Sequence, residues 1–341
     1  MTATTPGLVC AHHHLYSALA RGMPAPPRTP TNFTEILDQI WWRLDAALDL
    51  DLVRWSALLG AVEALEAGTT AIVDHHASPS AIDGSLDVIA AACAEVGVRV
   101  VCAYEVTDRH GPESAKAGLA ENERFIRAGG RGLVGAHACL TLSDDTLDAV
   151  VGLAADLGVG VHIHVGEDAV DAGAAERLRP HARDDWLLAH CVHVDPPLAG
   201  TVAHNPRSNM NNGVGYARPA RWSAAGNRVV LGSDGIGAAM VDEFALAYVA
   251  QRADDVTATP DDAWDWLQAG TDFVPEVRGD QVTWAADRVD PWYLAFTPGV
   301  RAQRVVVDGD VVVDGGVCTR VDAARIRARA WEEAQRLWSM L

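Results

Sequence analysis

The chain has 341 residues, with 27 basic and 46 acidic side chains and a formal net charge of −19. This length suits two average domains or one large α/β barrel. So negative a chain disfavours nucleic acid and anionic membrane surfaces as partners, because both repel it. The apolar runs are short and interrupted, so we expect no signal peptide, no membrane-spanning segment and a cytoplasmic location.

The cysteines are scattered, mostly within apolar runs, and no two of them form a Cys-x-x-Cys pair. They are Cys10, Cys93, Cys102, Cys139, Cys191 and Cys318. This distribution predicts reduced core residues, and it is atypical of a disulfide framework or a thiolate zinc site.

Short β-type runs alternate with longer helical stretches, which is the pattern of repeated βα units. The runs are Leu8 to His14, Ala71 to His76, Val100 to Glu105, Gly132 to Ala138, Gly160 to Val165, Trp186 to Val192, Gly200 to Pro206 and Val229 to Gly235. Eight such strands predict an α/β fold, a (β/α)₈ TIM-like barrel over residues 1–270.

Polar residues occupy the ends of these runs, where a (β/α)₈ barrel carries its active site. Of the 13 histidines, 11 lie at or just beyond a strand end. Random placement would not produce this. By strand-end position, the expected substrate-binding residues are His76, Tyr104, Glu105, His137 and Asn209, with His75 beside them.

A long insertion follows the first run, and we interpret it as a lid over the barrel mouth. It comprises a proline-rich stretch, Arg21 to Pro30, and a helical stretch, Asn32 to Leu50, that contains Trp41 and Trp42. A tryptophan pair in a helix is more often packing than a substrate platform, although Arg21 and Trp41 are candidate contacts from the lid.

Beyond the barrel strands we expect one helix over Asp242 to Ala269 and a remodelled C-terminal segment over residues 271–341. That segment contains a β-hairpin, Arg304 to Val313, whose Asp308-Gly309 pair is a strong turn signal. A helix from Asp322 to Leu341 follows it.

Four of the strand-end residues form a ligand set of three nitrogens and one oxygen: His12, His14, His164 and Asp234. His12 and His14 are two apart, so one face of a strand presents both. The set suits one divalent metal ion that retains a position for water, most readily Zn²⁺, with Fe²⁺ or manganese as alternatives. Glu167 follows the third ligand closely and is placed to donate a proton to a substrate nitrogen.

These residues match a known family. The segments Pro6 to His14, His164 to Glu167, Ala189 to His193, His204 to Asn209 and Leu231 to Asp234 resemble the amidohydrolase superfamily. The resemblance is to its mononuclear branch of triazine hydrolases and deaminases (the ATZ/TRZ type). A finer resemblance, to aminohydrolases of the SsnA type, rests on Leu15 to Met23, Trp41 to Asp45, Asp74 to Pro79 and His137 to Ser143.

The resemblance implies roles for single residues. His12, His14, His164 and Asp234 would bind zinc, or less often iron, and Asp234 would also accept a proton from the attacking water. Glu167 would protonate a ring nitrogen, and His190 would hydrogen-bond the developing oxyanion. The implied reaction is hydrolytic deamination of a small nitrogen heterocycle with release of ammonia.

Two alternatives stay open. One is release of chloride or an alkylamine from a triazine-like ring, and the other is a catalytically silent metal-binding protein. A lysine-bridged two-metal site is disfavoured, because the single lysine, Lys116, lies outside the strand ends. His13 is expected to support a ligand or to face the substrate.

The sequence also departs from the family. Members usually begin with a β-sandwich segment, whereas only seven residues precede the first barrel strand here. We therefore expect the N-terminal sandwich strands to be missing and the C-terminal hairpin to be a reduced β remnant. Its edges would suit a partner subunit, and homo-oligomer formation stays open.

Overall fold

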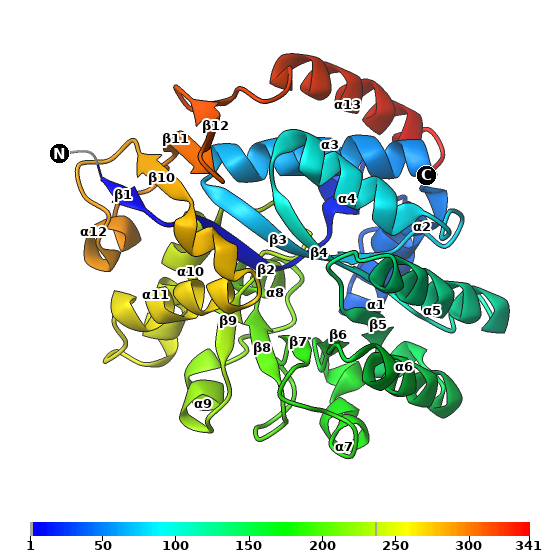
Figure 1. The fold of residues 1–341 in the computed structure, drawn as a ribbon. Helices are drawn as coiled ribbons and strands as arrows, with labels where there is room; N and C mark the ends of the chain where they lie inside the picture. Colours follow the sequence, from blue (N-terminus) through cyan, green and yellow to red (C-terminus); the bar gives the residue numbers. More distant parts are fainter. Residues whose placement is uncertain (1–2, 236) are drawn as a thin grey trace.

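The structure, a computed structural model, describes residues 3–235 and 237–341. Parallel strands form its centre, and helices surround them (Figure 1). The barrel strands are β2 (Leu8–His13), β3 (Thr69–His76), β4 (Arg99–Tyr104), β5 (Val134–Ala138), β6 (Val161–Val165), β7 (Leu187–His190), β8 (Thr201–His204) and β9 (Val229–Leu231). Each lies within one residue or two of a predicted run or inside it.

Two sheets make up this barrel, one of β2 to β4 and one of β5 to β9. Parallel bridges join them at both seams: Cys102 pairs with Gly132 and Val106 with Ala136 on one side, and His13 pairs with Asp234 on the other. The ring of strands is thereby closed, which confirms the predicted (β/α)₈ barrel.

The barrel strands are buried along nearly their whole length, as expected of parallel strands that are covered on both faces. Alternate positions of neighbouring strands supply one compact cluster of mostly small aliphatic side chains: Val9, Ala11, Ala71, Val73, Val101, Leu187, Ala203 and Val230. These small residues fill the barrel interior, so the polar residues at the strand ends lie directly above a closely packed apolar core.

Most helices of the outer ring follow a barrel strand. They are α3 (Leu50–Glu66), α4 (Ser85–Val96), α5 (Pro112–Arg127), α6 (Asp144–Leu157), α7 (Ala174–Leu178), α8 (Pro206–Asn211), α9 (Pro219–Ala224), α10 (Met240–Asp254) and α11 (Pro260–Ala269). The prediction of a single helix over Asp242 to Ala269 is wrong, because two helices, α10 and α11, cover this stretch. Pro260 has no N–H to continue a helix, and Thr259 and Asp262 form a capping box that starts a new one.

The predicted lid forms a compact helical segment between β2 and α3. It consists of α1 (Phe33–Ile36), a π-helical turn (Leu37–Trp41) and α2 (Trp42–Ala47). The Asn32 side chain accepts a hydrogen bond from the Glu35 N–H and caps the first turn, while Asp49 caps α3 in the same way.

An antiparallel accessory sheet packs beside the barrel. Its strands are β1 (Thr4–Thr5), β10 (Gln281–Trp284), β11 (Ala302–Val307), β12 (Asp310–Asp314) and β13 (Val317–Cys318), with α12 (Pro291–Ala295) between β10 and β11. The predicted hairpin is β11 and β12, and its turn residues Asp308 and Gly309 both have positive φ, of 51° and 87°.

The accessory sheet is larger than the hairpin remnant that the sequence predicts. In particular, the expectation that no sandwich strand precedes the barrel differs from the structure, since Thr4 and Thr5 pair with Thr283 and Val282 of β10. The indole N–H of Trp284 also donates to the Thr5 hydroxyl, at 2.9 Å. A strand of two residues is too short to show an alternation of apolar and polar side chains. The sequence therefore does not predict β1, which is recognised only by its pairing with β10.

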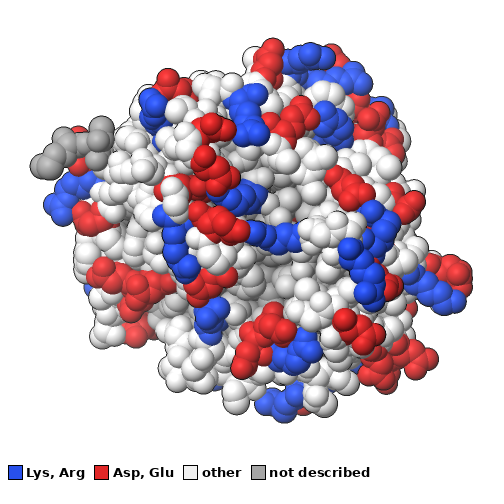
Figure 2. Space-filling view, in the orientation of Figure 1, with Lys and Arg blue, Asp and Glu red and all other residues white. Residues whose placement is uncertain are grey.

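The last helix, α13 (Ala323–Trp338), lies against α3 on the outside of the barrel (Figure 1). Ion pairs join the two, from Arg327 to Glu66 and from Arg336 to Asp49. In the described ranges no helix is both long enough and apolar enough to cross a membrane. On the face drawn in Figure 2, Lys and Arg side chains are interspersed among Asp and Glu.

Candidate active site

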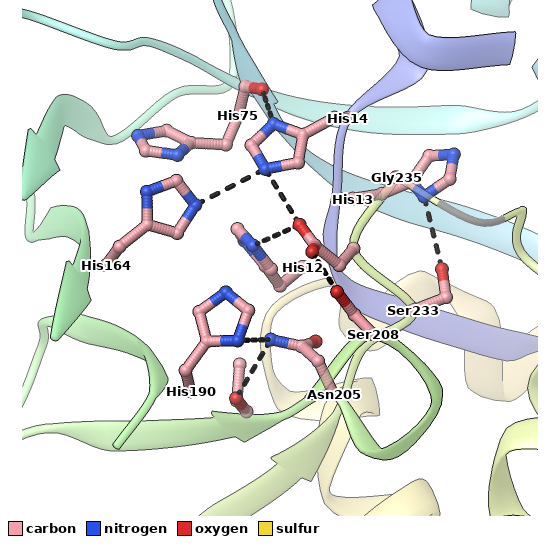
Figure 3. Close-up of polar contacts among 12 residues, drawn as sticks. His12, His13, His14, His75, His164, His190, Asn205, Ser208, Ser233 and Gly235 are labelled. Carbon is pink, nitrogen blue, oxygen red and sulfur yellow. Dashed lines mark hydrogen bonds and ion pairs between the residues drawn. The ribbon is translucent and has the colours of Figure 1, made fainter. Parts of the chain in front are cut away.

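Four side chains converge at the C-terminal end of the barrel, and Figure 3 labels the three histidines among them. His12 and His14 come from the end of β2, His164 from β6, and Asp234 follows β9. Asp234 Oδ1 lies 2.9 Å from His14 Nε2 and 3.3 Å from His12 Nε2. His14 Nε2 and His164 Nε2 are 3.3 Å apart. The structure thus brings together the whole predicted ligand set.

A change of register in β2 directs these histidines. Cys10 pairs with Ile72 of β3 but His13 pairs with Asp74, so β2 has one residue more than β3 over this stretch. Such an irregularity re-aims the side chains that follow it. His12 and His14 therefore face the centre, while His13 points away and its Nδ1 lies 3.1 Å from the Ser233 hydroxyl (Figure 3).

Backbone carbonyls fix the orientation of two ligand rings. His14 Nδ1 donates to the carbonyl of His75 at 2.5 Å, and His164 Nδ1 donates to the carbonyl of His137 at 3.0 Å. Their Nε2 atoms are thus turned toward each other and toward Asp234. In metal centres, the ring nitrogen that does not bind the metal commonly donates to a carbonyl or carboxylate in this way. Two ligands about 2.1 Å from a tetrahedral metal are about 3.4 Å apart, so these residues fit a divalent metal ion.

The local charge favours a cation at this point. Burial lowers the pKa of His14, but Asp234 and Glu105 outweigh it and raise that pKa to about 9. Burial likewise raises the pKa of Asp234, yet the hydrogen bonds from His12 and His14 hold it well below its ordinary value. The surroundings of His14 thus stabilise a positive charge. A metal ion bound to His14 would replace its ring proton and supply that charge.

Two residues of the site have left-handed backbone conformations that non-glycine residues rarely adopt: His190, with φ of 74°, and Asp234, with φ of 57°. The Asp234 N–H donates to the carbonyl of His12 at 3.0 Å, and the Ser208 hydroxyl donates to its Oδ2. Packing therefore maintains a strained conformation that aims the carboxylate at the histidines, which is typical of functional sites.

Glu167 and His190 form the second half of the site. His190 Nδ1 donates to Asn209 Oδ1 at 2.8 Å, which directs Nε2 toward Glu167 Oε2, 3.6 Å away. Among the described residues, His190 Nε2 has no hydrogen-bond partner. Burial raises the pKa of Glu167 to about 7, although His190 opposes the shift. Burial thus favours the protonated form of Glu167, which can donate that proton.

One cavity opens onto these groups and encloses about 700 Å³, including its mouth. The lid supplies an apolar and largely aromatic side, and the strand ends supply a polar side. The wall consists of His14, Tyr16, Phe33, Leu37, Trp41, Trp42, Asp45, Glu105, His137, Ala138, Leu140, His164, Glu167, Asp168, Asp171, Asn212, Asp234 and Gly235. Within the part of the chain that the structure describes, this wall carries six carboxylates and no lysine or arginine.

Some predicted substrate residues line this cavity and others do not. Glu105 and His137 belong to the wall, whereas His76, Tyr104 and Asn209 are buried behind it. His76 Nε2 lies 2.8 Å from the Ser78 hydroxyl. Tyr104 packs toward α5, where Asn122 bonds to its backbone. Since side chains of a strand alternate, His75 faces the barrel interior and His76 faces outward.

The lid contributes more to the cavity than the sequence indicates. Trp41 and Trp42, which we expected to serve packing, both line it, together with Phe33 and Leu37. The Trp42 ring also lies over the Arg109 guanidinium, 4.7 Å from its centroid. Arg21 makes no such contribution, because it pairs with Glu63 at 2.6 Å outside the cavity.

Several wall residues outside the barrel strands escaped prediction. Asp45, Asp168, Asp171 and Asn212 come from segments without strand periodicity. Asp168 and Asp171 lie close to Glu167 in the sequence, and that proximity was the one available signal.

Residues 3–270 match the Amidohydrolase family, and the chain belongs to that family. The predicted superfamily is thus confirmed. A 5'-deoxyadenosine deaminase of Methanopyrus kandleri is 28% identical, over 98% of this chain and 86% of the relative. A 5-methylthioadenosine/S-adenosylhomocysteine deaminase of Symbiobacterium thermophilum is 35% identical, over 67% of this chain and 56% of the relative.

Solved structures show the same fold. An adenosine deaminase from Xanthomonas campestris with bound zinc superposes with a TM-score of 0.83 at 19% identity, over 99% of this chain and 86% of that one. An atrazine chlorohydrolase from Arthrobacter aurescens, complexed with zinc, superposes with a TM-score of 0.78 at 22% identity, over 97% and 88%.

Proposed function

We propose that this chain is a metal-dependent aminohydrolase that removes the amino group of an adenine-type nucleoside and releases ammonia. The observation that carries the proposal is the convergence of His12, His14, His164 and Asp234 beside Glu167 and His190, at one cavity. Relatives that match nearly the whole chain are deaminases of 5'-deoxyadenosine. They support an adenosine derivative as the substrate class.

We infer that zinc is the metal, since three imidazoles and one carboxylate at these spacings suit it and two structural neighbours hold it. When bound, such an ion would lower the pKa of water and so make water a stronger nucleophile near neutral pH. The cysteines of the described chain are free and buried, which supports a reducing compartment such as the cytoplasm.

The side chains divide the proton transfers. As the water oxygen bonds to the amine-bearing carbon, Asp234 takes one water proton and Glu167 gives its proton to the adjacent ring nitrogen. Because the Nδ1–H of His190 bonds to Asn209, Nε2 carries a hydrogen only when the ring is doubly protonated; in that form Nε2, which has no partner among the described residues, donates to the oxygen that becomes negative. When the bond from carbon to the exocyclic nitrogen breaks, the proton on Asp234 leaves with ammonia. The remaining hydroxyl proton returns to Glu167, and the product keeps a carbonyl and a ring N–H.

The cavity wall indicates what accompanies the heterocycle. Aromatic rings of Tyr16, Trp41 and Trp42 suit the faces of a purine. Six carboxylates and no lysine or arginine in the described wall disfavour phosphate, so a nucleoside is favoured over a nucleotide.

Ammonia release across adenosine, 5'-deoxyadenosine, 5-methylthioadenosine and AMP tests the proposal. The three nucleosides are expected to react and AMP to react at least about 100-fold more slowly. In Glu167→Gln, turnover is expected to fall about 10²- to 10⁴-fold while bound metal stays unchanged. Chloride or alkylamine release from triazines without ammonia release would instead identify a triazine-type hydrolase. A metal-loaded protein that turns over none of these compounds would be catalytically silent.

A further inference from the structure

We propose that Arg109 is a positioning residue for the substrate, because it holds the lid helix α2 on the rim of the barrel and so fixes one wall of the cavity. Arg109 follows β4 in the chain and lies outside the cavity wall of the described residues. Its guanidinium contacts Asp45 and Trp42 of α2, and both of these line the cavity. The kinetic effect of this contact rests on the proposed function, whereas the position of the lid does not.

One face of α2 meets Arg109. Trp42 and Asp45 are three positions apart on this helix, so their side chains lie on the same side of it. Arg109 Nη2 donates to Asp45 Oδ2 at 3.0 Å, and the guanidinium carbon lies 4.7 Å from the centroid of the Trp42 ring. A single side chain of the barrel therefore binds the lid both by an ion pair and by a cation–π contact.

The barrel in turn holds Arg109. The Thr107 hydroxyl accepts from the backbone N–H and from the Nε–H of Arg109, each at 3.3 Å. The ion pair is largely buried, with the side chain of Arg109 10% exposed and that of Asp45 3% exposed. Water and salt screen such a pair less than a surface pair. Arg109 is thus a fixed and partly buried point of attachment for the lid.

The charge of Arg109 serves Asp45 more than Glu105. Glu105 Oε1 lies 3.7 Å from the same Nη2 that donates to Asp45. Burial raises the pKa of Glu105 to about 7, although His14 and Arg109 oppose the shift. Burial raises the pKa of Asp45 only to about 6, because Arg109 opposes it at shorter range. Loss of the guanidinium would therefore leave the lid carboxylate buried without a counter-charge, which strongly favours opening of the lid.

The Trp42 ring transmits this contact to the cavity. Its centroid lies 6.3 Å from that of the His137 ring, at an interplanar angle of 65°. His137 also lines the cavity, and its backbone carbonyl orients the ligand ring of His164. Arg109 thereby sets the distance between the aromatic lid wall and the strand ends that carry the proposed metal site.

Steady-state kinetics with 5'-deoxyadenosine tests this role. Arg109→Gln is expected to raise KM about 10- to 100-fold with kcat changed less than about fivefold, since the reacting groups stay in place. Arg109→Lys keeps the charge but loses the planar guanidinium, so its KM should lie between the two. Arg43→Gln, which removes an arginine of α2 outside the described cavity wall, is the matched control and should keep the wild-type KM. A fall in kcat with KM unchanged in Arg109→Gln would overturn the proposal.

A double variant separates one shared contact from two independent roles. Asp45→Asn breaks the ion pair with Arg109 from the lid side. Arg109→Gln combined with Asp45→Asn should raise KM no more than the larger of the two single changes, because both remove the same contact. Effects on KM that multiply in the double variant would contradict a shared contact.

The position of the lid can be measured without turnover. Amide hydrogen exchange over residues 33–47, followed by mass spectrometry in the whole ligand-free protein, should become about tenfold faster in Arg109→Gln, because local opening of the lid costs less. Exchange in the barrel strands, and over residues 33–47 in Arg43→Gln, should match wild type. If Arg109→Gln does not fold, Asp45→Asn gives the same comparison from the lid side. Unchanged exchange over residues 33–47 would overturn the proposal.

Failure of this role and failure of the proposed function give different results. Faster exchange of the lid in Arg109→Gln, in a protein whose wild type deaminates no nucleoside, would support the role of Arg109 and contradict the proposed function. Lid exchange and KM at wild-type values in an active Arg109→Gln variant would contradict the role of Arg109 and leave the deamination intact.

Discussion

At the scale of single residues, hydrogen-bond partners set the orientation of several groups in the site. Asn209 is the clearest case, because its side-chain oxygen accepts from His190 Nδ1 and thereby directs Nε2 at the reacting oxygen. Ser208 on Asp234 and the carbonyls of His75 and His137 on the ligand rings act in the same way.

Asn209→Leu removes the acceptor for His190 and keeps the volume nearly unchanged. We expect kcat to fall about 10- to 100-fold with little change in KM, because ring orientation matters most in the transition state. Asn209→Asp keeps an acceptor and should restore most of the rate. Steady-state kinetics of both variants checks this, and an equal loss in both would argue for a purely structural role.

Glu243 offers a test of stability against pH. Burial raises its pKa to about 7, although Arg207 opposes the shift, whereas an unfolded glutamate has a pKa of about 4.3. The folded state thus binds this proton more tightly, so the stability due to Glu243 is full below about pH 4.3 and declines as pH rises through about 7.

Urea unfolding at pH 5 and pH 8 measures this effect. Glu243→Gln should gain free energy of unfolding relative to wild type as the pH rises from 5 to 8. Glu113→Gln, a change at an exposed residue of α5, controls for the altered net charge. A difference between Glu243→Gln and wild type that is the same at both pH values would contradict the prediction.

At the scale of elements, sequence reasoning succeeded where the periodicity was strong. The barrel strands, and the convergence of the four predicted ligands at their ends, follow from alternation and from the strand-end rule. His75 and His76 were both expected at the cavity, because the sequence alone does not show the register: Asp74 pairs with His13, which faces away, so His75 faces the barrel interior and His76 faces outward. The lid and the loop carboxylates lack such a pattern, and tertiary packing alone places them.

Trp41 tests the role of the lid. In Trp41→Ala we expect KM to rise about tenfold, equivalent to about 1.4 kcal/mol of lost binding, with kcat and melting temperature little changed. The reason is that Trp41 is only partly buried and lines the cavity. Trp331→Ala, which removes a tryptophan on α13 that is 54% exposed, should leave KM unchanged. A large loss of stability without a change in KM would assign Trp41 to packing.

At the scale of the whole molecule, the proposed metal site joins strands from opposite ends of the barrel sequence. Its ligands come from β2, from β6 and from the residue that pairs β9 back onto β2. A metal bound there stabilises only the closed barrel, because the unfolded chain does not hold these residues together.

Chelation of the metal should therefore lower the melting temperature by roughly 5–10 °C, if the ion is present at about a thousand times its dissociation constant. Scanning calorimetry before and after treatment with a chelator measures the shift, and added Zn²⁺ should reverse it. An unchanged melting temperature in protein shown to have lost its metal would mean that the site does not contribute to barrel closure.

The seam between β2 and β9 also determines when the site can form during synthesis. His12, His14 and His164 leave the ribosome well before Asp234, and the N–H groups of Ser233 and Asp234 bond to the carbonyl of His12. A nascent chain that ends ahead of β9 thus carries three of the four ligands on an open sheet. Metal loading at full affinity consequently belongs to the last stage of folding, after β9 has been translated and has closed the ring.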